Sequence, residues 1–143
     1  MVDELAKELA GERILYCVVV TPEKTVLDHA AEFVALPLFD GELGVAPGRA
    51  PMIGRLGYGE LRMVEGGQTK RLYVDGGFVQ IANNRVTVLT NRAIPAAELD
   101  EAVASEQLES ALQRPANSEE LLTVRDRAIL QARGQIRTAR RAK

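Results

Sequence analysis

Residues 59–90 read GELRMVEGGQTKRLYVDGGFVQIANNRVTVLT, and this stretch decides the fold. Apolar, β-branched and aromatic residues alternate with polar ones at 59–65, 69–74, 77–82 and 85–90, which is typical of half-buried strands. Gly66-Gly67 and Asn83-Asn84 separate neighbouring runs, and both pairs suit tight turns because they tolerate positive φ. The segment therefore predicts antiparallel strands joined by hairpins.

The same pattern extends toward the N-terminus. Strands are predicted at 14–20, 25–38 and 52–56, with Pro22 at the turn between the first two. Short strands at roughly eight- to ten-residue spacing, with no helix between them, favour an antiparallel sandwich or flattened barrel. We expect this β-sandwich domain to cover residues 13–95, preceded by a short polar helix or frayed tail at 1–12.

The pattern changes at Pro95, which suits the first turn of a helix. Residues 96–113 lack Gly and Pro and are rich in Ala, Glu and Leu, so they predict a helix. Residues 114–117 interrupt it, and Ser118 is the expected N-cap of a second helix that runs to about residue 140. Its apolar seam is Leu122, Ile129, Ala132, Ile136 and Ala139. The predicted fold is thus mainly β plus α, with a two-helix antiparallel hairpin over 96–143.

Charge is distributed unevenly over this helical hairpin. Residues 96–113 hold five acids and no base, whereas residues 127–143 hold six bases and no acid. The two helices are therefore electrostatic complements. Their seam is rich in alanine and buries little apolar area, which places the helical hairpin at the low-stability end of the structure and makes it a candidate conformational switch.

Composition excludes several classes of function. A chain of 143 residues is one ordinary domain, or one domain plus an appendage, and its net charge of −2 argues against general nucleic-acid binding. No apolar stretch approaches the ~18 residues of a membrane span, and the acidic N-terminus is not a signal peptide, so we expect a soluble, cytoplasmic protein. Cys17 and His29 are the only residues of their types, and no metal-ligand spacing occurs. We expect no catalytic residue, metal or cofactor.

Residues 41–51 read GELGVAPGRAP, with three glycines and two prolines. This composition predicts a rigid, tightly folded loop, because proline fixes φ and glycine permits positive φ. The loop would present Glu42 and Arg49 at defined places. A shaped loop on a β body is typical of a docking element.

Together with residues 19–64 and 72–94, this loop resembles the ε subunit family of bacterial and chloroplast F-type ATP synthases. The resemblance rests on an opening V-(S/T)-P, the Gly-Pro loop, L-x-x-G-x-(L/I)-R and a closing run that ends in N-x-V-(T/I)-(V/I)-L. It implies a non-catalytic central-stalk subunit that links the γ subunit to the membrane c-ring in proton-driven ATP synthesis. Such a subunit lies at the cytoplasmic face of the bacterial plasma membrane and meets the membrane only through the complex.

The resemblance also implies roles for individual residues of the sandwich. Glu42 and Arg49 would approach the c-ring, and Arg49 stands where the family commonly has histidine. The residues implied to shape the loop are Gly41, Gly44, Pro47 and Gly48. The residues implied to contact γ are Asp75, Gly76, Gly77 and Phe78. Gly76 and Gly77 would permit close backbone approach, or equally mark a bulge.

The helical hairpin is the family's regulatory device, which extends along γ to the α and β subunits and blocks ATP hydrolysis. The basic residues implied here are Arg127, Arg133, Arg137, Arg140 and Arg141, with a solvated charged face as the alternative. Some members bind ATP through (I/L)-D-x-x-R-A. Leu99, Asp100 and Ala104 match this motif, but Val103 replaces its arginine, so no cation is placed for phosphate.

Two classes of function stay open from the residues alone. One is the rotary-ATPase subunit, and the other is a stand-alone β-sandwich adaptor whose helical hairpin binds a partner. Co-purification separates them, because a stalk subunit should be isolated with much larger nucleotide-binding subunits.

Overall fold

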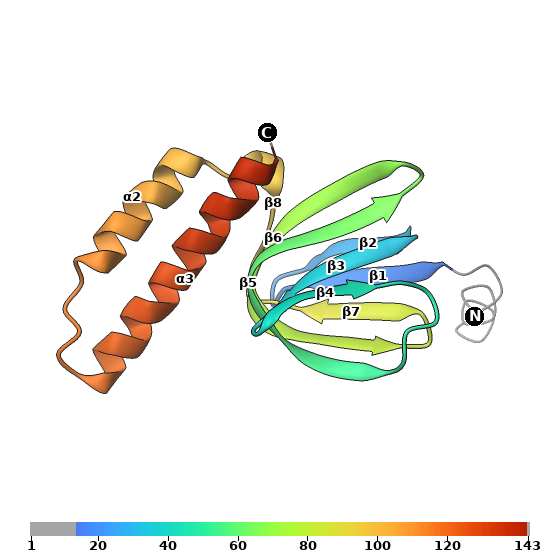
Figure 1. Cartoon of the computed structure of the whole chain (residues 1–143), viewed down its shortest axis with the longest axis horizontal. Helices are drawn as coiled ribbons and strands as arrows, with labels where there is room; N and C mark the ends of the chain where they lie inside the picture. Colours follow the sequence, from blue (N-terminus) through green and yellow to red (C-terminus); the bar gives the residue numbers. More distant parts are fainter. Residues whose placement is uncertain (1–13, 143) are drawn as a thin grey trace.

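The computed structural model describes residues 14–142. It shows a β-sandwich followed by two helices (Figure 1). The helix or tail predicted at residues 1–12 lies outside the described residues. The strands are β1 (Leu15–Val20), β2 (Thr25–Ala31), β3 (Phe33–Leu38), β4 (Gly41–Val45), β5 (Met52–Glu65), β6 (Gln68–Ala82), β7 (Arg85–Leu89) and β8 (Ala93–Pro95). The predicted combination of a β-sandwich and two C-terminal helices is confirmed.

The strands are ordered β2-β1-β7-β6-β5-β3-β4 in one continuous sheet, and β8 pairs with β6. Neighbours run antiparallel except β1 and β7, which are parallel, with Tyr16 opposite Arg85. The predicted turns are confirmed, because Gly66, Gly67, Asn83 and Asn84 all have positive φ. The sheet folds over on itself, so two layers enclose one core (Figure 1).

Several strand boundaries differ from the prediction. The runs 52–56 and 59–65 form the single strand β5, and the runs 69–74 and 77–82 form the single strand β6. Conversely, residues 25–38 divide into β2 and β3. The expected loop at 41–51 begins with strand β4, which pairs with β3 and sets Glu42 opposite Pro37. Glu42 therefore lies on a short edge strand, and only residues 46–51 form the loop.

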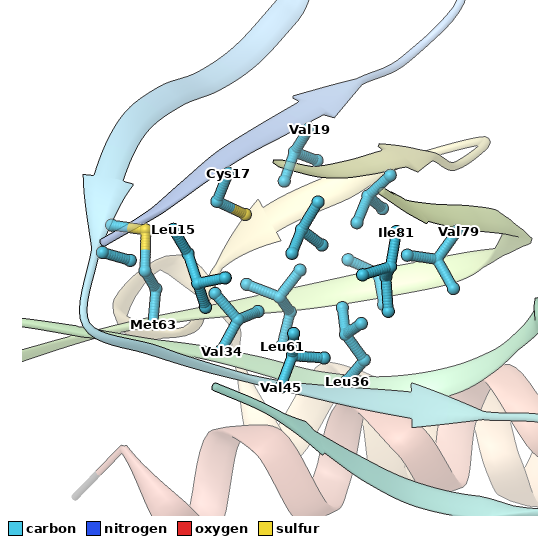
Figure 2. Close-up of a cluster of buried hydrophobic side chains, with 14 of the residues drawn as sticks. Leu15, Cys17, Val19, Val34, Leu36, Val45, Leu61, Met63, Val79 and Ile81 are labelled. Carbon is cyan, nitrogen blue, oxygen red and sulfur yellow. The ribbon is translucent and has the colours of Figure 1, made fainter. Parts of the chain in front are cut away.

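The core lies between the two layers, where side chains from alternate positions meet (Figure 2). Its labelled members are Leu15, Cys17, Val19, Val34, Leu36, Val45, Leu61, Met63, Val79 and Ile81. Each fully buried aliphatic side chain contributes about 1.5–3 kcal/mol relative to exposure, so the sandwich supplies most of the molecule's hydrophobic stabilisation. Cys17 is inaccessible here, and burial raises its pKa to about 12, so its sulfur is an inert thiol.

The helical part begins with a short 3₁₀ turn, η1 (Ala96–Glu98), and continues as α2 (Glu101–Leu112) and α3 (Glu119–Arg141). The helix predicted over 96–113 is an α-helix only from Glu101, because residues 96–98 form the 3₁₀ turn with Pro95 at its N-cap. Asp100 is the N-cap of α2, because its Oδ1 accepts hydrogen bonds from the N–H groups of Ala102 (2.9 Å) and Val103 (3.3 Å). The predicted N-cap of α3 is confirmed, with Ser118 Oγ accepting from the Leu121 N–H at 3.1 Å.

Helix α3 lies between α2 and the sandwich, against β5 and β6 (Figure 1). We call this arrangement the docked hairpin. Ile129, Ala132, Ile136 and Ala139 of the predicted seam are buried. Leu122 is 43% exposed, because the N-terminal part of α3 extends away from the sandwich together with the α2–α3 turn. The prediction that Leu122 belongs to the seam is therefore wrong.

Candidate functional site

The outer face of β5 and β6, turned away from the core, is only half covered. Where α3 crosses it, Glu60, Tyr73 and Asp75 are buried. The uncovered half carries Ile53 and Arg55 of β5, with Phe78 opposite Arg55 and Leu89 opposite Phe78. One continuous sheet surface therefore has a docked half and an open half.

Apolar side chains concentrate on the open half. Ile53 is 75% exposed, Phe39 59%, Phe78 58% and Leu89 53%, and these are the large exposed hydrophobic residues of the described sandwich. The Arg55 guanidinium lies 4.3 Å from the centroid of the Phe39 ring, which extends the surface beyond the sheet. We call Phe39, Ile53, Phe78 and Leu89 the open patch. Contiguous exposed apolar surface of this kind marks an interaction site.

The residues predicted to contact γ are split between the two halves. Phe78 belongs to the open patch, whereas the Asp75 carboxylate lies beneath α3. Tyr73 Oη donates to Asp75 Oδ1 at 2.7 Å, and Gln131 Nε2 of α3 donates to Asp75 Oδ2 at 3.2 Å. Burial, reinforced by the Asp75 carboxylate, raises the pKa of Tyr73 well above its ordinary value. Tyr73 is therefore a permanent donor to Asp75.

Gly76 and Gly77 are accounted for by packing within the chain. Gly77 has φ +106°, and a Cβ there would lie 1.9 Å from the Leu89 carbonyl oxygen. Gly76 has φ +71° and lies against the Tyr58 ring. Close approach is therefore needed for the neighbouring strand and ring, and of the four predicted residues Phe78 offers the exposed side chain.

Helix α3 approaches the sheet most closely at Gly134. A Cβ at this position would lie 2.5 Å from the Tyr58 carbonyl oxygen and 3.2 Å from the Tyr73 ring. Arg137 Nη2 donates to the same carbonyl oxygen at 3.4 Å. Sequence reasoning missed Gly134, although an isolated glycine inside a helical pattern is a signal of close packing.

A second contact of the docked hairpin is electrostatic and centres on Glu60, whose side chain is 3% exposed. Its Oε1 lies 2.9 Å from Arg71, 3.5 Å from Arg62 and 3.9 Å from Arg141 at the end of α3. Its Oε2 is buried without a hydrogen-bond partner among the described residues. Arg141 is thus held near the sheet by a carboxylate that has spare accepting capacity.

Glu42 and Arg49, the two predicted c-ring contacts, lie on different parts of the molecule. Glu42 Oε1 is 3.4 Å from Arg62, and with Arg137 and Arg141 it lines a cavity of about 380 Å³ beside α3. Arg49 lies in the loop at the end of the sandwich farther from the helices (Figure 1). The structure therefore does not bring these two residues together.

The loop 46–51 is fixed by its neighbours. The Gly48 N–H donates to Asn84 Oδ1 at 2.7 Å, which ties the loop to the β6–β7 turn. Gly41 and Gly48 have positive φ, a Cβ on Gly44 would lie 3.0 Å from the Phe33 ring, and Pro47 is half-buried. Arg49 is exposed, and its Nη1 reaches the Gly44 carbonyl oxygen only at 3.5 Å. Pro47 and Gly48 thus lie in the loop that carries Arg49, whereas Gly41 and Gly44 belong to strand β4.

The remaining basic residues of α3 differ in their surroundings. Arg140 Nε is 2.6 Å from Glu101 Oε1 of α2, so the expected charge complementarity between the helices is realised at this pair. Arg127 lines a groove beside the open patch, and Arg133 is exposed.

The partial ATP motif does not converge on one place. Asp100 is occupied as the N-cap of α2, and with Leu99 it lines a shallow hollow. Val103 instead lines a polar groove of about 590 Å³ between the helices, with Arg92 and Arg114. The described residues contain no cluster of three or more potential metal ligands. Within 14–142, no helix combines the length and apolar character that a bilayer crossing requires.

Comparison with known proteins accounts for this architecture. Residues 14–96 match the family model described as ATP synthase, Delta/Epsilon chain, beta-sandwich domain. The ATP synthase epsilon chain of Rhodopirellula baltica is 55% identical over 124 residues, covering 87% of this chain and 97% of that protein. The chain belongs to the ATP synthase epsilon-chain family. Epsilon chains are non-catalytic subunits of the ATP synthase complex, so the expectation that this chain is not an enzyme by itself is confirmed.

Other relatives extend the likeness. The ATP synthase epsilon chain of Granulibacter bethesdensis is 42% identical over 127 residues, covering 85% of this chain and 94% of that one. A chain of the Euglena gracilis mitochondrial ATP synthase structure superposes with a TM-score of 0.74 at 21% identity, over 90% of this epsilon chain and 79% of that chain. A chain of the Tetrahymena thermophila mitochondrial ATP synthase central stalk and c-ring structure superposes with a TM-score of 0.69 at 13% identity. The superposition covers 87% of this chain and 96% of that chain. These two structural likenesses concern the fold.

Proposed function

We propose that this epsilon chain is a rotor subunit that links the γ subunit to the c-ring in proton-driven ATP synthesis. It would act at the cytoplasmic face of a bacterial plasma membrane, held there only through the complex. The open patch carries the proposal, because its apolar side chains lie uncovered on an otherwise well-packed sandwich. Phe78 lies in this patch between Arg55 and Leu89, and we propose that the γ subunit binds the patch.

The c-ring contact is proposed for the loop 46–51. Arg49 is exposed there on a turn braced by the Gly48–Asn84 hydrogen bond. A guanidinium offers a planar fork of N–H donors that suits carboxylates, so the proposed contact is charge-based. Glu42 would contribute only where the ring also reaches the edge strand β4.

A second role, inhibition of ATP hydrolysis by the helical hairpin, is supported by how the arginines of α3 are held. Arg137, Arg140 and Arg141 contact Tyr58, Glu101 and Glu60 while the hairpin is docked. Undocking from the sandwich would release Arg137 and Arg141, which with Arg127 and Arg133 would then be available for acidic surfaces of the α and β subunits. The Arg140–Glu101 pair lies within the hairpin and would persist. The same helix would thus either contact the sandwich or act on the catalytic head.

Binding of the cognate γ subunit tests the main role. Phe78→Asp places a charge in the open patch and should weaken γ binding at least tenfold. Leu112→Asp is the matched control, because Leu112 is 45% exposed on α2, away from the patch. Equal affinities for both variants would refute the γ contact. An unmodified chain that co-purifies with no ATP synthase subunit would favour the adaptor function instead.

Inhibition is tested by reversing charge on α3. Arg133→Glu, Arg137→Glu and Arg140→Glu together would replace attraction to acidic surfaces by repulsion, so ATP hydrolysis by the assembled complex should rise. The increase should shrink at high salt, where exposed charges are screened. If hydrolysis is unchanged both in this variant and in a complex that lacks residues 96–143, the helical hairpin does not inhibit.

A further inference from the structure

A groove lies between the open patch and the docked hairpin. It encloses about 860 Å³, with Phe39, Arg55, Phe78 and Leu89 on the sandwich side and Arg127 and Gln131 on the α3 side. We propose that one segment of γ, carrying a carboxylate flanked by apolar side chains, fills this groove and contacts both walls. Binding of γ would then stabilise the docked hairpin. This inference rests on the γ contact proposed above.

The charge of the groove calls for an acidic occupant. Arg55 and Arg127 face it from opposite walls, and within residues 14–142 neither guanidinium has a carboxylate at ion-pair distance. The acid that lines the groove is Asp75, and its oxygens already accept from Tyr73 and Gln131, with Arg92 3.9 Å away. The groove is therefore net positive, and a carboxylate on the partner would complement it.

The apolar lining specifies the rest of the segment. Phe39, Phe78 and Leu89 are each more than half exposed, and the Arg55 guanidinium stacked on Phe39 places a cation directly above apolar surface. A partner side chain that reaches Arg55 would lie beside the Phe39 ring and its apolar neighbours. Apolar residues beside the carboxylate would bury them, and such buried central contacts dominate interface energetics.

The α3 wall exists only while the hairpin is docked. Arg127 and Gln131 lie one turn apart on α3, and the Gln131–Asp75 hydrogen bond fixes that turn against β6. A segment that touches both walls binds the docked state more tightly than the undocked one. By linkage, docking must raise γ affinity by the same factor by which γ favours docking.

A double-mutant cycle in the full chain measures this coupling. Arg127→Ala should weaken binding of the cognate γ subunit by about two- to tenfold, and Arg127→Lys should restore most of it. Arg133→Ala is the control, because Arg133 is exposed on the same helix and does not line the groove. Gly134→Ala removes the close approach that docking needs, so in that background Arg127→Ala should have no further effect.

Hydrogen exchange of the α3 amides gives an independent readout and remains decisive if Gly134→Ala leaves the hairpin docked. Adding γ to the unmodified chain should slow exchange in α3. Exchange that is unchanged or faster, or equal γ affinities of Arg127→Ala and Arg133→Ala, would overturn the inference. The proposed γ contact would survive those results if Phe78→Asp still weakens binding, and would fail if the unmodified chain binds no γ.

Discussion

At the scale of single residues, Glu60 is the buried charge that connects the sheet to the end of α3. Glu60→Gln keeps the shape of the side chain but leaves Arg62, Arg71 and Arg141 without their shared counter-charge. Those arginines are partly exposed and regain water, so we expect a loss of about 1–3 kcal/mol of unfolding free energy. Urea unfolding measures it.

Glu42→Gln is the matched control for this substitution. Glu42 pairs with Arg62 at 3.4 Å, but its side chain is 49% exposed. Exposed ion pairs contribute little, so the expected loss is below about 1 kcal/mol. Equal losses for the two variants would show that burial of Glu60 does not strengthen its contacts.

Cys17 should make stability fall at alkaline pH. Burial raises the pKa of the folded thiol to about 12, whereas an unfolded cysteine ionises near 8.5. Between these values the folded chain binds more protons than the unfolded chain, so the unfolding free energy decreases as pH rises from about 8.5 toward 12. Cys17→Ala should remove this component, and identical pH slopes for the two proteins would contradict it. A thiol reagent should likewise react with Cys17 only after unfolding.

At the scale of elements, docking of α3 depends on Gly134. Alanine is intrinsically better in a helix by about 1 kcal/mol, yet its Cβ would lie 2.5 Å from the Tyr58 carbonyl oxygen. Gly134→Ala should therefore weaken docking by about 1–3 kcal/mol while helix content is kept. Faster exchange of α3 amides with unchanged exchange in β5 would report this. Arg133→Ala, which adds no contact with the sheet, should leave exchange unaltered.

The polar groove between α2 and α3 bears on nucleotide binding. Val103 stands there with Arg92 and Arg114, where ATP-binding relatives would place an arginine. We expect the unmodified chain to bind ATP at millimolar Kd or weaker, about −4 kcal/mol. Val103→Arg should strengthen binding if these cations act together, and Val103→Gln supplies the size without the charge. Micromolar binding by the unmodified chain in calorimetric titration would contradict this expectation.

Elements with a local signal could be predicted from the sequence, and elements fixed by distant contacts could not. The two hairpin turns are predictable because Gly66-Gly67 and Asn83-Asn84 tolerate positive φ. The start of α3 is predictable because serine, here Ser118, is a preferred N-cap residue. The glycines of strand β4 favour a loop by their local chemistry, and only the pairing of this segment with β3 makes it a strand. The sequence predicts too early a start for α2 because Pro95 and Asp100 both suit a helix start. Pro95 instead ends β8 and pairs with Leu72 of β6.

The candidate site was only partly predictable for the same reason. Phe78 was identified, but its neighbours Phe39, Ile53 and Leu89 come from three other segments that only strand register brings together. Gln131 covers Asp75 and donates a hydrogen bond to it, although the two residues are 56 positions apart in the sequence. No local pattern encodes such a contact.

At the scale of the whole molecule, the sandwich should fold without the helical hairpin provided that β8 is kept. Strand β8 pairs with β6, and the Arg92 carbonyl oxygen accepts the Asp75 N–H at 3.1 Å. A fragment of residues 1–96 should unfold cooperatively and still bind γ, with Tyr73 newly exposed and its phenol accessible to nitration. A fragment of residues 1–91 should be markedly less stable. Failure of the longer fragment to fold would mean that α3 supplies essential core.

The long pairing of β5 with β6 also has a mechanical consequence. Strand β5 has 14 residues, about 46 Å at ~3.3 Å per residue, and its ladder with β6 runs from Met52 beside the loop 46–51 to Glu65. It passes the open patch at Ile53 and the α3 crossing at Tyr58. A twisting load applied at the loop would therefore reach both other surfaces through backbone hydrogen bonds along the strands, with one lapse in the pairing at Gly57 and Gly76. Such a stiff element would transmit torque with little elastic loss, and a proline in place of Val79 should soften it.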